Sequence, residues 1–255
     1  MAKPHLRRLH RLKREFGHLD EKDIFKEYHY QRVSAVQSDT DEPQLLFHLF
    51  PSGLLEEYLL IDVTDFRSNQ VFIPAVCRGE YNPQKLRQHP QIAWDRITGS
   101  FENHNGLTSE VTVYDTGLYE VSGNGLLYTI SAGYDVEHVI SSMDLELTTI
   151  TALARYINLL QNDYGQQLYG ILSGINLTEA TIDQHRKVED MTAFSDPVLT
   201  SRLTTINPQN ESSPRTQLDP LFRPFYLSKA TQISDLYFGE DGEWELADKI
   251  PSRID

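Results

Sequence analysis

The sequence predicts an α+β fold, and three features of the chain support that prediction. The middle of the chain is β-rich, with a meander expected near residues 110–131. One long buried helix is expected near residues 142–163, and the N-terminus reads as an amphipathic basic helix. The chain therefore divides into a basic N-terminal helical arm (1–30), an α+β body (31–205) and an extended, aromatic-rich C-terminal segment (206–255).

The overall composition is that of a globular chain. Of the 255 residues, 39% are hydrophobic and 24% are charged, far from the compositions typical of disordered proteins. No apolar run approaches the roughly 18 residues that a membrane-spanning helix needs, so no membrane span is expected. Because Cys77 is the single cysteine, it cannot form an internal disulfide or anchor a thiolate metal cluster, and synthesis in a reducing cytoplasm is expected.

Opposite charges are segregated along the chain. The formal net charge is −14, yet the first fourteen residues hold six Lys or Arg and no acidic residue. On a helix, the apolar residues from Leu6 to Leu19 fall on one side and the cationic residues on the other. Such a face can bind nucleic-acid phosphates, an anionic membrane surface, or an acidic surface of the same or a neighbouring subunit. The candidate nucleic-acid-binding or partner-binding residues are Lys3, Arg7, Arg8, Arg11, Lys13 and Arg14.

Strand-like runs follow the arm. Residues 44–50, 57–63 and 70–77 are apolar, rich in β-forming residues and bounded by turn residues. Pro74 makes the third run an edge strand or a bulge. His48, inside the run LLFHLF, is expected to be a hydrogen-bonded core histidine rather than a catalytic base.

The predicted meander spans residues 110–131. Short β-branched and aromatic runs are interrupted at 115–117 and 122–125, which predicts three strands joined by two tight turns. Asn124 and Gly125 supply residues that tolerate a positive φ at the second turn.

The predicted long helix begins after Ser141, where Ser141 and Asp144 have the spacing of a capping box. Gly165 follows its last periodic residue. A short apolar run (168–174) comes next, and a more polar helix is expected over 178–191. The buried stripe of the long helix is predicted to hold Met143, Leu147, Ile150, Ala154, Ile157 and Leu160.

The C-terminal segment is interrupted by prolines and shows little periodicity, which predicts an extended path. It carries too many large apolar side chains for a free tail, so it is expected to cover the body or a neighbouring copy. The residues predicted as oligomer contacts are Phe222, Phe225, Tyr226, Tyr237, Phe238 and Trp244.

The sequence carries no familiar phosphate-binding, dinucleotide-binding, zinc-protease or serine-hydrolase motif. No catalytic residue, metal ligand or cofactor is therefore assigned. The enzyme alternative is a metal-dependent hydrolase or nuclease, in which Glu57, Asp62 and Asp65 hold a divalent cation. A lysine that could hold phosphate beside them is missing, since none lies between Lys26 and Lys85.

The order of elements resembles the portal, or connector, proteins of small tailed phages. The resemblance rests on the basic N-terminus, the segment SSMDLELTTITALARYINLLQN, the run QQLYGILSG and the segment beginning LTEATIDQ. Portal subunits form a ring around a DNA channel, usually with at least two long stem helices, of which only one is clear here. The resemblance implies a non-enzymatic subunit of a phage or virus-like particle (head, neck, portal or tail), located in the virion and forming a homo-oligomer. A monomeric adaptor that binds a protein partner through the arm is the other alternative.

Overall fold

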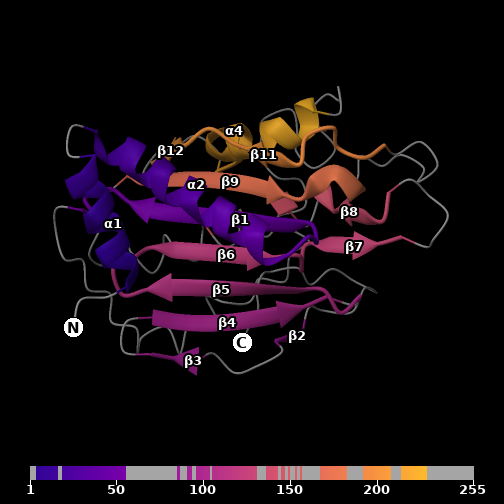
Figure 1. Cartoon of the computed structure of the whole chain (residues 1–255), viewed down its shortest axis with the longest axis horizontal. Coiled ribbons are helices and arrows are strands. Elements are labelled where there is room, and N and C mark those ends of the chain that lie inside the picture. The colour runs from indigo at the N-terminus through magenta and orange to yellow at the C-terminus, as the bar shows by residue number, and fades with distance from the viewer. Residues whose placement is uncertain are drawn as a thin grey trace.

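An antiparallel sheet of nine strands forms the centre of the described fold (Figure 1). Its strand order is β11-β9-β1-β6-β5-β4-β2, with β12 also paired to β9 and β3 also paired to β4. The strands are β1 (Gln44–Pro51), β2 (Lys85–Leu86), β3 (Gln91–Ile92), β4 (Arg96–Glu102), β5 (Thr108–Tyr114), β6 (Tyr119–Gly123), β9 (Leu168–Ile175), β11 (Val198–Thr200) and β12 (Thr204–Ile206).

The structure is a computed structural model that describes part of the chain. The described residues are 4–16, 19–55, 85–86, 91–93, 96–103, 105–130, 136–142, 145–146, 149, 153, 156, 167–182, 192–207 and 214–228. Within them, the side chains of residues 4–8, 10, 85, 86, 92, 101 and 214–216 lie outside the description.

The remaining elements include a small second sheet and several helices. The second sheet has the order β10-β8-β7, with β7 at Leu127–Thr129, β8 at His138–Ile140 and β10 at Ala180–Ile182. The helices are α1 (Pro4–Glu15), α2 (Glu21–Asp39), a short 3-10 helix (Leu177–Glu179) and α4 (Pro214–Leu227). The α+β prediction is confirmed. No helix in the described part is long and apolar enough to cross a membrane.

The two faces of the large sheet are covered by different helices, because successive side chains of a strand point to opposite faces. In β9, Tyr169 and Ile171 belong to the apolar cluster around α1 and α2. Leu168 and Leu172 belong instead to the cluster that contains α4. All eight residues of β9 are buried, as expected for a strand covered on both faces.

Glycine lets α4 lie close to the sheet. A Cβ atom at Gly174 would lie 2.8 Å from Cε1 of Phe225 and 2.7 Å from Cδ1 of Leu177. Both distances are shorter than a van der Waals contact, so the strand needs a residue without a side chain there.

The prediction for residues 44–50 is confirmed by β1, a central strand paired with β9 and β6. Its alternate residues serve both faces: Leu45 and Phe47 lie in the cluster with α4, and Phe50 lies in the cluster with α1 and α2. The runs 57–63 and 70–77 lie outside the described residues.

The meander prediction is confirmed for its first two strands and corrected for the third. β5 and β6 pair as an antiparallel hairpin, but β7 pairs with β8 in the second sheet. The positive φ at the second turn belongs to Gly123, at 132°, rather than to Asn124 or Gly125. Asn124 instead binds the start of β5, since its N–H donates to the Thr108 carbonyl at 2.9 Å and its Oδ1 accepts from the Thr108 N–H at 3.0 Å. This anchoring directs the chain away from the hairpin.

The start of the predicted long helix is confirmed, and its predicted end lies outside the described residues. Leu145 donates its N–H to the Ser141 carbonyl at 2.9 Å, and Ser142 is the first helical residue. The predicted stripe residues Met143, Leu147 and Ile150 lie outside the described residues, as do the other three. The described helical residues of this segment are all buried, namely Ser142, Leu145, Glu146, Thr149, Leu153 and Tyr156.

The helix expected over 178–191 is wrong for residues 180–182, which form β10. These three residues are buried and pair in parallel with β8. Burial of Ala180 and Ile182 in the core outweighs the helical propensity of the surrounding polar residues. Residues 183–191 lie outside the description.

The extended path predicted for the C-terminal segment is wrong for residues 214–227, which form helix α4 despite Pro220 and Pro224. A proline inside a helix costs about 3 kcal/mol, so the two cost about 6 kcal/mol. Burial of a large apolar side chain contributes about 1.5–3 kcal/mol, so five of them contribute about 8–15 kcal/mol. The five are Leu218, Leu221, Phe222, Phe225 and Tyr226, with the i, i+3, i+4, i+7, i+8 spacing of one helix face.

Replacing Gly123 by alanine tests the turn that separates the two sheets. A Cβ atom there would lie 2.4 Å from the Thr108 carbonyl oxygen. Left-handed strain of about 1–2 kcal/mol and overpacking of about 1–3 kcal/mol predict a loss of about 2–5 kcal/mol in the free energy of unfolding, measured by urea denaturation. Gly106→Ala is the matched control, because Gly106 also has a positive φ but its nearest atom would be 3.7 Å away. Equal losses in the two variants would contradict this reading.

Candidate functional site

Helix α1 packs against α2 through its apolar side. Leu9 and Leu12 are fully buried among Ile24, Phe25 and Tyr28 of α2. Phe16 and Leu19 pack at the edge of the same cluster. The predicted amphipathic helix is therefore confirmed over Pro4–Glu15, and it is attached to the body rather than extended as a separate arm. Helix α2 runs without interruption from Glu21 to Asp39, so the domain boundary predicted after residue 30 falls inside a helix.

The cationic side of α1 faces solvent. Arg11, Lys13 and Arg14 are exposed. Arg11 Nε lies 3.5 Å from Glu15 Oε1, and the two side chains are 58% and 52% exposed, so the pair contributes little to stability. Lys13 Nζ donates to the Leu55 carbonyl at 3.2 Å, a neutral acceptor. Lys3 lies outside the described residues, as do the side chains of Arg7 and Arg8.

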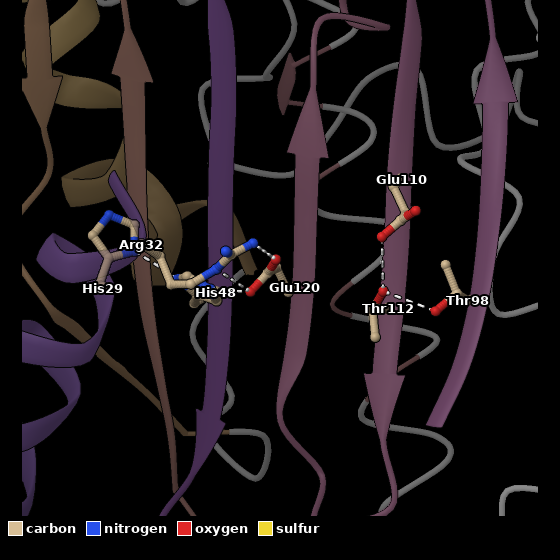
Figure 2. Close-up of polar contacts among 7 residues, drawn as sticks. All are labelled: His29, Arg32, His48, Thr98, Glu110, Thr112 and Glu120. Atoms are coloured by element: carbon tan, nitrogen blue, oxygen red, sulfur yellow. Dashed lines mark hydrogen bonds and ion pairs between the residues drawn. The ribbon is translucent and has the colours of Figure 1, made fainter. Parts of the chain in front are cut away.

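A series of hydrogen-bonded polar side chains connects α2 to the large sheet, and Figure 2 shows four of its members, His29, Arg32, His48 and Glu120. His29 Nδ1 lies 2.7 Å from His48 Nδ1, and His48 Nε2 lies 2.8 Å from Glu120 Oε2. At the other end, His29 Nε2 lies 2.7 Å from Ser173 Oγ, which is 2.7 Å from Thr200 Oγ1. The members come from α2, β1, β6, β9 and β11, so this chain connects one helix to four strands. We call it the buried polar chain: Arg32, Glu120, His48, His29, Ser173 and Thr200.

Arg32 completes the chain at the Glu120 end. Its guanidinium binds both carboxylate oxygens, with Nη2 2.6 Å from Oε1 and Nε 3.2 Å from Oε2. A bidentate pair of this kind fixes orientation as well as charge. Since His48 shares Oε2, the Glu120 carboxylate has a partner on each side.

The electrostatic balance keeps Glu120 ionised. Burial by itself raises the pKa of Glu120, but the hydrogen bonds and charges of His48 and Arg32 outweigh burial and lower that pKa to about 2. The guanidinium of Arg32 is affected in the opposite sense, because its bonds to Glu120 outweigh burial and raise its pKa. Burial, followed by the charge of His48, lowers the pKa of His29 well below 6.5.

The face of the sheet that carries Glu120 also carries polar side chains on the next two strands, β5 and β4. On β5 and β4, Thr112 Oγ1 lies 3.1 Å from Thr98 Oγ1, and Glu110 is exposed on the same face (Figure 2). Polar side chains therefore continue across the sheet from Glu120: Thr112 is buried, Thr98 is partly exposed and Glu110 is exposed. The alternation in EVTVY follows from this arrangement, because Val111 and Val113 face the core on the other side.

The buried polar chain has the residue types of a serine hydrolase, but its geometry supports a structural role. Ser173, His29 and His48 are each 0% exposed, so a substrate atom could reach Ser173 Oγ only if α2 moved away. Within the described residues, no group of three or more His, Cys, Asp or Glu side chains is placed to hold a metal ion. The expectation that His48 is a hydrogen-bonded core histidine is confirmed.

The structure places the other predicted site residues as follows. Phe222, Phe225 and Tyr226, predicted to contact a second copy, are buried in the core of their own chain, because α4 folds their face onto β9 and β12. They present no surface to a neighbouring copy. Tyr237, Phe238 and Trp244 lie outside the described residues. So do Glu57, Asp62 and Asp65 of the metal-dependent alternative.

His29, Arg32, Glu120 and Ser173 were not predicted as site residues from the sequence. Glu120 and Arg32 are separated by 88 positions in the chain, so no local pattern connects them. One indication was present in the sequence: Glu120 stands between Tyr119 and Val121, at a strand position where a charge must find a partner if it is buried.

Comparison with known proteins finds no matching family model, no matching curated protein and no matching solved structure.

Replacing Glu120 by glutamine tests the central ion pair. The change leaves Arg32, whose side chain is 29% exposed, without its counter-charge. Removing one partner of a fully buried pair costs about 3–5 kcal/mol, and the partial exposure of Arg32 places the expected loss at the lower end of that range. We expect the free energy of unfolding to fall by about 3 kcal/mol in urea denaturation. Glu110→Gln is the matched control on the neighbouring strand, and because Glu110 is exposed its effect should stay within about 0.5 kcal/mol. A loss below about 1 kcal/mol for Glu120→Gln would show that the pair does not support the fold.

The low pKa of His29 predicts that stability falls in mild acid. Above pH 6.5 neither the folded nor the unfolded chain protonates this ring, so its contribution is fully present; below 6.5 only the unfolded chain takes up the proton. The free energy of unfolding should then fall by up to about 1.4 kcal/mol per pH unit from this one group. Glu120 adds a second loss between its ordinary pKa of 4.5 and its folded value of about 2.

Urea unfolding at a series of pH values from 7.5 to 5 measures the first of these losses. His29→Gln serves as the comparison, because it lowers stability at every pH but removes the titrating ring. Its stability should depend less steeply on pH than that of the parent chain. The same slope in both proteins would contradict the assignment to His29.

Proposed function

We propose that the protein is a non-enzymatic structural subunit of a phage or virus-like particle, and that the exposed cationic face of α1 binds nucleic acid. The observation that supports the proposal most directly is the division of α1 between two surroundings. Leu9 and Leu12 are fully buried against α2, while Arg11, Lys13 and Arg14 face solvent. The helix is held in place by one side and presents charge with the other.

A helix held in this way suits a regular polyanion. Its cationic groups keep fixed spacings, and binding releases counterions from the phosphates without first ordering a flexible arm. The Arg11–Glu15 pair at 3.5 Å is exposed and weak, so a phosphate can displace Glu15 at little cost.

The acidic body directs such a partner to α1. Apart from the first fourteen residues, the chain holds 17 Lys or Arg against 37 Asp or Glu. A polyanion is repelled by a surface of that sign and attracted to the one cationic segment. Contact through α1 alone is therefore favoured over a duplex that lies across the body.

An acidic neighbouring copy is the alternative partner. Asp39, Asp41 and Glu42 are exposed at the C-terminal end of α2, and α1 packs near its other end. The 19 residues of α2 span about 28 Å at 1.5 Å per residue. Opposite charges separated by this distance favour head-to-tail contacts, which close into a ring or continue as a filament.

The double variant Arg11→Gln/Arg14→Gln tests the cationic face. If both side chains contact phosphates, DNA affinity measured by fluorescence anisotropy should fall. The slope of log K against log salt should also decrease in magnitude by about 1.8, since each phosphate contributes about 0.9. Arg202→Gln/Arg223→Gln is the matched control, because it removes the same charge from exposed positions elsewhere and should leave the affinity and slope almost unchanged.

Light scattering of the same two variants decides between the partners. Unchanged DNA binding together with a loss of oligomer in Arg11→Gln/Arg14→Gln would favour the acidic neighbouring copy. If neither binding nor oligomeric state depends on these residues, the cationic face is not the contact and the proposal fails.

A further inference from the structure

Two complete arrangements of protons fit the buried polar chain, and they differ by one proton. Both leave Glu120 ionised, as its two partners require. In both, every nitrogen and oxygen between Glu120 and Thr200 has a hydrogen-bond partner, which buried polar groups require.

In the neutral arrangement, both rings carry one proton each. His48 donates from Nε2 to Glu120 and accepts at Nδ1 from the Nδ1–H of His29. His29 then accepts at Nε2 from the Ser173 hydroxyl, and Ser173 accepts from the Thr200 hydroxyl. All hydrogen bonds point from Thr200 towards Glu120.

In the protonated arrangement, His48 carries protons on both nitrogens. It still donates from Nε2 to Glu120, but its Nδ1–H now donates to Nδ1 of His29. His29 therefore carries its proton on Nε2 and donates to Ser173, and Ser173 donates to Thr200. The bonds between His48 and Thr200 all point the opposite way.

We propose that His29 and His48 together form a binding site for a single proton, and that uptake of this proton reverses every hydrogen bond from His48 to Thr200. Four transfers balance the step. A solvent proton bonds to the Thr200 oxygen, the Thr200 proton passes to Ser173, the Ser173 proton passes to His29 Nε2, and the His29 Nδ1 proton passes to His48 Nδ1. No electron is exchanged. The partly exposed Thr200, on β11, is the entry point.

The groups around the pair explain why it takes the first proton and rejects a second. The described titratable or charged groups that face the two rings or their immediate partners are Tyr28, Tyr30 and Arg32 from α2, Tyr114 from β5 and Glu120 from β6. Glu120 is the only carboxylate among them, and it contacts His48 rather than His29, so the proton settles on His48. Burial raises the pKa of Tyr114 to about 12, so that ring stays neutral.

A second proton would place two N–H groups face to face. With both rings charged, the Nδ1 atoms, now 2.7 Å apart, would both carry protons and neither could accept. The contact between α2 and β1 would then break. Because α1 packs on α2 through Leu9 and Leu12, acid beyond the first proton should release the whole two-helix layer.

Nitrogen-15 NMR of the histidine rings in the full chain tests the proposal. We expect the ring nitrogens of His29 and His48 to titrate with one common midpoint and a total uptake of one proton, with His48 Nδ1 and His29 Nε2 becoming protonated together. In Glu120→Gln the midpoint should fall by at least one pH unit, a tenfold loss of proton affinity, because the neighbouring negative charge is gone. Glu110→Gln should leave it in place, and the ring of His138 in the second sheet reports any change that affects the fold as a whole.

Three results would overturn the proposal: two independent titrations that each reach a full imidazolium in the folded protein, rings that both stay neutral until the chain unfolds, or an unchanged midpoint in Glu120→Gln. If that variant does not fold, the titration of the parent chain decides alone. Nucleic-acid binding by α1 does not enter this measurement, so its outcome is separate from that of the proposed function.

Discussion

The burial of one carboxylate constrains much of this structure. Glu120 is 5% exposed in the middle of a sheet, and an ionised carboxylate in such a place requires charged or hydrogen-bonding partners. β1 supplies one partner, His48, from the adjacent strand, and α2 supplies the other, Arg32, from the layer above. The position of α2 over the sheet is thus set by the need to reach Glu120, and the contact of His29 with Ser173 fixes the helix at a second point.

The packing of α1 against α2 depends on the same constraint. A helix held at two polar points presents a fixed apolar edge, formed by Ile24, Phe25 and Tyr28. Phe25 stacks on Phe50 of β1 with ring centroids 4.4 Å apart, so the apolar and polar contacts of α2 reinforce one another. Helix α1 closes this edge with Leu9 and Leu12, which leaves its cationic side outward. The direction in which the charge faces therefore traces back to the buried carboxylate.

The sequence predicted correctly those helices and strands whose residue pattern lies within one short segment. The amphipathic spacing of Leu9 and Leu12 gave α1, and the apolar run around His48 gave β1. Helix α4 was missed because Pro220 and Pro224 are strong local breakers, and the burial that outweighs them depends on β9 and β12, which are distant in the chain. β10 was missed for the same reason, since a short strand acquires its partner only from β8.

The candidate site shows the same difference between features set by neighbouring residues and features set by residues far apart in the sequence. The cationic residues of α1 are close together in the sequence and were found from it. The buried polar chain was not, because Arg32, His48, Glu120 and Ser173 come from four separate elements and acquire a common role only when the sheet places β6, β1 and β9 side by side. His48 alone was identified as a core residue, from its apolar neighbours.

A double-mutant cycle between Arg32 and Glu120 tests the central claim most directly. The cycle compares the free energies of unfolding of the parent chain, Arg32→Gln, Glu120→Gln and the double variant, and isolates the coupling between helix and sheet. If the buried carboxylate fixes α2 through Arg32, the coupling energy should be about 2–3 kcal/mol, with the double variant losing much less than the sum of the two single losses. A coupling energy below about 0.5 kcal/mol would mean that α2 is held by its apolar contacts alone, and would contradict this account.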